Sequence, residues 1–251
     1  MSSGKPEITL IASFTDFGPT GLYQGQMDAV LATQAPNTPR VTLMTDAPMF
    51  DAQAAGLLLS SLCDYMPPST LFLAVVDPGV GGDRQPLIVR TWRNIFVGPD
   101  NGLFVPVVQR HDNCAIEVIE WRPEGLSESF HGRDLFAPAA AKLANGEPVK
   151  RSLLNREDIA GFHSIPDRKR IIYLDHFGNA MTGVIADAVD DNTLISINGR
   201  SMRYARTFSE VPVGELFWYR NSLGLVEVAV NCGSAASLLD LELGARVRVG
   251  P

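Results

Sequence analysis

The sequence predicts an α/β N-terminal domain, with a Rossmann-like sheet and flanking helices, followed by a smaller C-terminal β-barrel. Strand-like and helix-like segments alternate over the first ~160 residues, which is the pattern of α/β packing. Beyond residue 168 the apolar runs become short, β-rich and separated by turn residues, as in small barrels. The 251 residues are enough for two domains. We place these domains at residues 1–165 and 166–251.

The N-terminal elements follow from apolar runs bounded by helix- and strand-breaking residues. Short apolar runs that end at polar or turn-forming residues predict strands at 8–14, 41–45, 71–76, 86–91 and 94–98. Apolar residues at helical spacing, ended by proline or Asn-Gly, predict helices at 22–34, 52–65 and 133–144.

The C-terminal elements are expected to be strands joined by tight turns. The expected strands are 171–174, 193–197, 216–219 and 225–230. Asn198-Gly199 lies between two short apolar runs, which is a strong signal for a hairpin turn.

Composition argues against several classes of function. The net charge is −7 and no run of basic residues occurs, so nucleic acid and anionic membranes are not expected partners. The start of the chain does not resemble a signal peptide, and no apolar run approaches the ~18 residues that span a bilayer. Three widely separated cysteines match neither a disulfide framework nor a zinc site. We therefore expect a cytoplasmic protein that binds no metal.

The run from Val75 to Arg84 is the most informative segment. An apolar strand ends at Asp77, because Pro78 and Gly79 cannot continue it. The carboxylate is thereby placed at the carboxyl end of a buried strand, where open α/β sheets bind ligands. The glycine-rich loop allows Arg84 to fold back towards Asp77. A charged turn with a simple ion pair is the alternative.

Three further segments carry candidate residues. Asp16 ends the first strand and could accept hydrogen bonds from a ribose diol, or form an Asx-turn or helix cap. His131 follows Phe130 in a setting that suits a titrating group, although a lone histidine is more often structural. The run from Asp175 to Asn179 could bind an amino-acid moiety or merely form β-turns. Pattern alone indicates a small-molecule site near Asp16, Asp77, Arg84 and His131.

Together these motifs resemble one family, the S-adenosylmethionine (SAM) hydroxide adenosyltransferases. These enzymes are adenosine-forming SAM hydrolases, related to fluorinases and chlorinases. The resemblance covers nearly the whole chain. The motifs that carry it are Thr15 to Gly18, Tyr23 to Met27, Ala54 to Leu59, Val75 to Gly81, Phe96 to Gly102, Phe130 to Pro138, Phe177 to Asn179 and Asn221-Ser222.

The resemblance implies a homotrimer that hydrolyses SAM without a cofactor, with active sites at subunit interfaces. Water or hydroxide would attack C5′ and release adenosine and L-methionine. Asp77, Arg84 and His131 are the implied catalytic set. In our hypothesis Asp77 and His131 orient a water and accept its proton, while Arg84 stabilises the developing hydroxide charge. The implied substrate-binding residues are Asp16 at the ribose, Phe50, Phe130, Asp175, Asn179 and Ser222.

The hydrolase branch fits better than the halogenases. Halogenases carry tyrosines at the positions of Asp77 and His131, and a serine where this chain has Gly132. Several positions depart from the family pattern: Gly21, Asp46, Gln85 and Leu223. Of these, Gly21 replaces an aspartate expected at the methionine end and puts affinity there in question. The alternatives are a SAM-dependent chlorinase, a non-catalytic SAM- or adenosine-binding protein and, more remotely, a nucleoside hydrolase.

Overall fold

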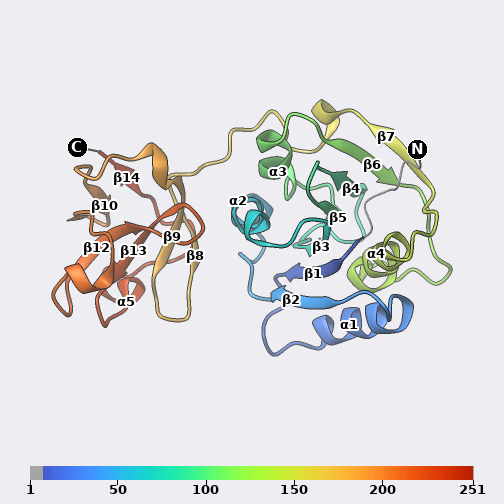
Figure 1. The fold of residues 1–251 in the computed structure, drawn as a ribbon, viewed down its shortest axis with the longest axis horizontal. Coiled ribbons are helices and arrows are strands. Elements are labelled where there is room, and N and C mark those ends of the chain that lie inside the picture. Colours follow the sequence, from blue (N-terminus) through green and yellow to red (C-terminus); the bar gives the residue numbers. More distant parts are fainter. Residues whose placement is uncertain (1–7, 251) are drawn as a thin grey trace. The chain divides into compact units, whose positions relative to one another are not determined.

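The computed structural model describes residues 8–250, and the chain divides into two compact units, with the boundary in the sequence between Ile165 and Pro166 (Figure 1). Each unit has its own core of buried apolar side chains. Across the described residues, no helix combines the length and apolar character needed to cross a membrane.

A seven-stranded mixed sheet forms the centre of the N-terminal unit. Its strands in spatial order are β2 (Arg40–Met44), β1 (Leu10–Thr15), β3 (Thr70–Val75), β5 (Ile95–Pro99), β4 (Pro86–Arg90), β6 (Ala115–Ile119) and β7 (Arg151–Leu154). The first four are parallel, and each of the last three pairs antiparallel with its neighbours. The α/β domain is therefore present, but half of its sheet departs from Rossmann-like parallel order. The tight β4–β5 hairpin reverses the chain, because its turn is too short for a parallel crossover.

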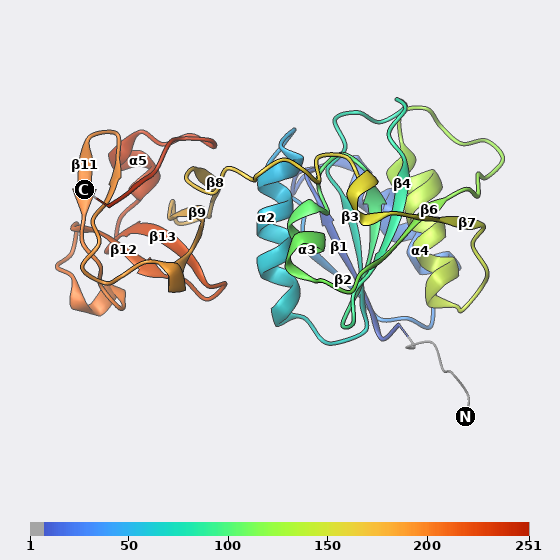
Figure 2. The same ribbon diagram turned by 90° about the horizontal axis from the view of Figure 1, so that it is seen from above.

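Helices cover both faces of this sheet. They are α1 (Leu22–Gln34), α2 (Ala52–Leu62), α3 (Val105–Arg110) and α4 (Ala137–Ala144), with short 3₁₀ turns at Cys63–Tyr65 and Arg156–Asp158. Figure 2 shows α2 and α3 on one face and α4 on the other, and α1 packs against α4. The Asp51 side chain caps α2 by accepting a hydrogen bond from the amide of Ala54 at 2.9 Å.

The helix expected at 133–144 is interrupted at its start. Residues Gly132–Phe136 form a π-helical turn, in which the amide of Ala137 donates to the carbonyl of Gly132, and only then does α4 begin. Such single π turns are frequently found at functional sites. Here the turn directly follows His131, so it sets the position of that imidazole.

Strand register brings two of the candidate carboxylates together. Within the parallel β1–β3 pair, Thr15 lies opposite Val75. Asp16 and Asp77 follow these strands and therefore lie at the same edge of the sheet. This is the carboxyl edge, where ligands bind in open α/β folds.

The C-terminal unit consists of two antiparallel sheets. The four-stranded sheet has the order β12 (Leu216–Arg220), β13 (Leu225–Val230), β9 (Ala180–Ile185) and β8 (Ile171–Leu174). The three-stranded sheet has the order β11 (Arg200–Met202), β10 (Ile195–Ile197) and β14 (Arg248–Val249). One helix, α5 (Ala235–Leu239), and 3₁₀ turns at Ala186–Ala188 and Phe208–Glu210 complete the unit. The expected hairpin at Asn198-Gly199 joins β10 to β11, while closure into a barrel stays a prediction.

Candidate active site

Arg84 bridges Asp77 and His131, which lie 54 residues apart in the sequence. Its Nε lies 3.1 and 3.0 Å from the two carboxylate oxygens of Asp77, and its Nη2 lies 2.6 Å from Oδ2. The same Nη2 lies 2.7 Å from Nδ1 of His131. The side chains of Arg84 and Asp77 are only 9% and 5% exposed, so this forked ion pair is screened little by solvent.

The contact with Arg84 determines which nitrogen of His131 carries the proton. A guanidinium can only donate, so Nδ1 of His131 must be the acceptor. The neutral ring therefore carries its hydrogen on Nε2. Burial lowers the pKa of His131, and the positive charge of Arg84 lowers it further, while Asp77 opposes this shift. The balance favours the neutral imidazole with an Nε2–H donor.

A close backbone approach explains one glycine of the loop between Asp77 and Arg84. Gly81 has a φ of +81°, and a Cβ at this position would meet the carbonyl oxygen of Glu128 at 2.5 Å. The loop thus packs directly on the segment that leads to His131. Only glycine combines this conformation with this proximity.

A pocket of about 230 Å³ adjoins Asp77, Arg84 and His131 in the N-terminal unit. Its lining residues are Asp16, Phe17, Tyr23, Phe50, Val75, Asp77, Pro78, Val80, Ser129, Phe130, His131 and Gly132. The rings of Phe17, Tyr23 and Phe130 form a cluster with centroids 5.2 to 5.8 Å apart. Phe17 and Tyr23 were not among the expected site residues, although both lie inside the motifs that carried the family resemblance.

Asp16 and Phe50 lie together at the rim of this pocket. The amide of Phe50 contacts Asp16 Oδ2 at 3.5 Å. Phe50 has a φ of +59°, which is uncommon for a residue other than glycine, and it is 76% exposed. Burial raises the pKa of Asp16, and the nearby charge of Asp77 contributes to the increase. The pocket therefore combines a carboxylate with an uncovered aromatic ring.

The predicted residues of the C-terminal unit surround a second, more open hollow. Asp175, Phe177, Asn179, Phe208, Val230, Cys232 and Gly233 line this space of about 610 Å³. Asp175 Oδ1 accepts from the amides of Phe177 and Asn179 at 2.9 and 2.8 Å, and Oδ2 accepts from Asn179 Nδ2 at 2.8 Å. The buried Oδ1 of Asn179 has no hydrogen-bond partner. Ser222 is exposed in the turn after β12 and lines neither hollow.

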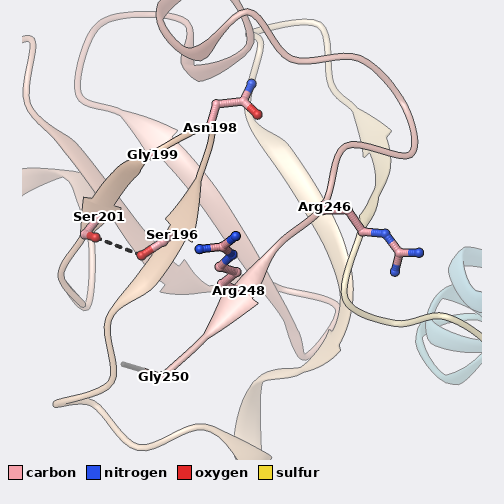
Figure 3. A pocket seen from close by; sticks show the side chains of 7 residues that line it. All are labelled: Ser196, Asn198, Gly199, Ser201, Arg246, Arg248 and Gly250. Atoms are coloured by element: carbon pink, nitrogen blue, oxygen red, sulfur yellow. Dashed lines mark hydrogen bonds between the residues drawn. The ribbon is translucent and has the colours of Figure 1, made fainter.

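A third hollow lies on the outer face of the β11–β10–β14 sheet and contains none of the predicted residues. Its volume is about 460 Å³. Figure 3 shows the guanidinium of Arg248 near Ser196, whose hydroxyl lies 2.8 Å from that of Ser201. Arg246, also in the lining, forms an ion pair with Asp167 at 2.6 Å. Among residues 8–250 no group of three or more His, Cys, Asp or Glu side chains could hold a metal ion.

Comparison with known proteins connects both units to one family. The family model for the SAM hydroxide adenosyltransferase N-terminal domain matches residues 9–152, and the model for the C-terminal domain matches residues 169–248.

Individual relatives match nearly the whole chain. A protein of Thermus thermophilus named (R)-S-adenosyl-L-methionine hydrolase is 37% identical, covering 94% of this chain and 97% of the relative. A protein of the same name from Salinispora arenicola is 32% identical, with coverages of 95% and 97%. The crystal structure of an uncharacterized conserved protein from Thermotoga maritima superposes with a TM-score of 0.84 at 30% identity, covering 96% of this chain and 100% of that one.

Proposed function

Because the chain belongs to the SAM hydroxide adenosyltransferase family, we propose that it hydrolyses SAM to adenosine and L-methionine. The Arg84-bridged set of Asp77 and His131 beside a pocket is the observation that carries this proposal. In the reaction, a bond forms between a water oxygen and C5′ of the ribose. The C5′–S bond breaks, its electron pair stays on sulfur, and the sulfonium leaves as a neutral thioether.

The leaving group departs as a neutral thioether and needs no acid. The task of the enzyme is therefore to orient the nucleophile and to accept its proton. The geometry supports a division of roles that differs from our sequence-based hypothesis. His131 Nε2 carries a hydrogen in the neutral ring, so the imidazole orients the attacking oxygen as a donor. Asp77 then accepts the proton. The attacking oxygen becomes strongly acidic as its bond to carbon forms, so a carboxylate can take its proton.

The first pocket would hold the nucleoside. Asp16 lies at the same sheet edge as Asp77, where its carboxylate could accept hydrogen bonds from both ribose hydroxyls. The exposed ring of Phe50 would stack on the adenine, and Phe130 would form part of the wall near C5′. Positioning of water in line with the C5′–S bond could lower the barrier by up to about 7–11 kcal/mol.

We further propose the homotrimer that the family resemblance implies, in which a neighbouring subunit supplies Asp175, Asn179 and Ser222. The first pocket, at about 230 Å³, is below the roughly 300–1,000 Å³ typical of small-molecule sites. The buried Oδ1 of Asn179 has no hydrogen-bond partner among the described residues, and an N–H group of the substrate could donate to it. Mixed trimers of Asp77→Asn and Asn179→Ala subunits test this arrangement. We expect them to regain activity that neither variant has alone, and the absence of such rescue would contradict sharing between subunits.

The configuration at sulfur is part of the proposal. The relatives are named for (R)-S-adenosyl-L-methionine, and the prefix L already fixes the α-carbon, so (R) denotes the sulfonium centre. We propose the same preference here. Separate assays of the (R) and (S) forms test it, and equal rates with both would contradict it.

One experiment distinguishes hydrolysis from its rivals. SAM is incubated with the protein in ¹⁸O-water, with and without chloride, and the products are analysed by mass spectrometry. We expect one ¹⁸O in adenosine, none in methionine, and no dependence on chloride. His131→Ala and Asp77→Ala should reduce kcat by about 10²–10⁴-fold. A chlorinated nucleoside would indicate a chlorinase, whereas tight binding of SAM without any product would indicate a binding protein.

A further inference from the structure

Glu227 is a buried carboxylate that the proposed mechanism does not use. It lies in β13 and is 2% exposed. Tyr219 Oη donates to its Oε1 at 2.8 Å, and Asn221 Nδ2 donates to its Oε2 at 2.7 Å. A carboxylate that accepts at both oxygens is arranged as an ionised group. Neither donor carries a charge that would neutralise it.

The environment of Glu227 makes its negative charge costly. Burial raises the pKa of Glu227, and Asp175 raises it further by repulsion. The pKa of the Tyr219 hydroxyl is raised as well, by burial and then by Glu227, with Asp175 also contributing. Asp175 and Glu227 therefore share one electrostatic environment. Placing two carboxylates in such surroundings costs stability unless a cation compensates them.

Each hydrogen bond to Glu227 supports a different part of the surface. Asn221 Oδ1 accepts from the amides of Leu223 and Leu225, both at 2.9 Å, and so shapes the turn that carries Ser222. Tyr219, on the other side, packs against Phe208 with ring centroids 5.4 Å apart. Phe208 lines the same hollow as Asp175 and Asn179.

We propose that Glu227 is a positioning residue for SAM: it anchors the Asn221–Leu225 turn and adds its charge to that of Asp175. The cation that this charge would favour is the methionine end of SAM, with its sulfonium and α-ammonium groups. The inference rests on the proposed function, because Asp175 and Ser222 are its substrate contacts. It assigns Glu227 to recognition of a positive charge, without contact to the reacting atoms.

The test compares binding of a charged and a neutral ligand. Glu227→Gln removes the charge, while its amide can still bond to Tyr219 and Asn221. Glu215→Gln removes an equal charge from an exposed position of the same unit and is the matched control. Calorimetry measures the Kd of each protein for SAM and for adenosine, which lacks both the sulfonium and the methionine end. Adenosine release at saturating SAM gives kcat in parallel.

We expect Glu227→Gln to weaken SAM binding about tenfold, as loss of one buried, weakly screened charge would, and to change adenosine binding less than twofold. Its kcat should stay within about threefold of wild type, and Glu215→Gln should leave both ligands unaffected. An unchanged ratio of the two Kd values in Glu227→Gln would overturn the proposal. If Glu227→Gln fails to fold, Tyr219→Phe takes its place, because it removes one of the two hydrogen bonds to Glu227. We expect Tyr219→Phe to weaken SAM binding threefold or more. Failure of the proposed function looks different, since wild type itself would then release no adenosine.

Discussion

Replacement of Arg84 by lysine tests the forked bridge most directly. Arg84→Lys keeps the positive charge but replaces a planar fork with a single ammonium, which cannot contact Asp77 and His131 in the same way. The variant should lose at least one charge-assisted hydrogen bond, at about 1.5–3 kcal/mol. If that bond acts in the transition state, kcat falls roughly 10- to 150-fold.

The assay is adenosine release at saturating SAM, together with thermal unfolding to show that the variant is folded. Arg90→Lys is the matched control, because Arg90 also pairs with a carboxylate in the same sheet, Glu117 at 3.1 Å, away from the pocket. We expect its kcat to stay within twofold of wild type. Arg84→Met should also destabilise the fold by about 3–5 kcal/mol, because Asp77 stays buried without a partner. A folded Arg84→Lys enzyme with wild-type kcat would refute the role given to the bridge.

Three further predictions concern the same edge of the sheet. In Arg84→Met the pKa of His131 should rise, because the cation that lowers it is removed while Asp77 remains; NMR titration of the ring checks this, and a fall would contradict it. Gly81→Ala should cost about 1–3 kcal/mol in denaturant unfolding, because its φ is positive and Glu128 blocks the Cβ. Gly79→Ala, whose Cβ meets nothing within 4 Å, should be neutral, and equal effects would contradict the argument. Adenosine binding should weaken as pH falls through the raised pKa of Asp16, because protonation removes an acceptor, whereas Asp16→Asn should bind weakly at every pH; calorimetry across the acidic range distinguishes the two.

The residues at strand ends were predictable because the cause is local. Asp-Pro-Gly stops a strand wherever it occurs, so Asp77 could be placed at the end of β3 from the sequence. The contact of Arg84 with Asp77 also spans only seven residues. The contact of Arg84 with His131 spans 47 residues, and no local pattern indicates such a pair. The sequence patterns indicated one site near both residues, and the family resemblance implied that they belong to one catalytic set.

Other features depend on tertiary packing and were missed. The helix α3 has only six residues. The strands β6 and β7 are also short, and Glu117 of β6 supports their pairing through ion pairs with Arg90 of β4 and Arg151 of β7. The antiparallel order of half the sheet follows from these pairings. The unpartnered oxygen of Asn179 and the shared environment of Glu227 and Asp175 are likewise properties of the folded chain.

The π-helical turn determines how the placement of His131 depends on the number of residues in this helix. A π turn accommodates one residue more than an α-helical turn of the same span. Deleting one residue between Gly132 and Phe136 would let α4 continue regularly to its start. Because the π turn absorbs that residue, this deletion would leave the segment before it in nearly the same orientation. A deletion within the regular turns of α4 would instead rotate that segment by about 100° around the helix axis, the angle per residue of an α-helix. Only such a rotation would turn the imidazole of His131 away from Arg84, so a residue can be lost from the π turn at less cost to the site than from α4.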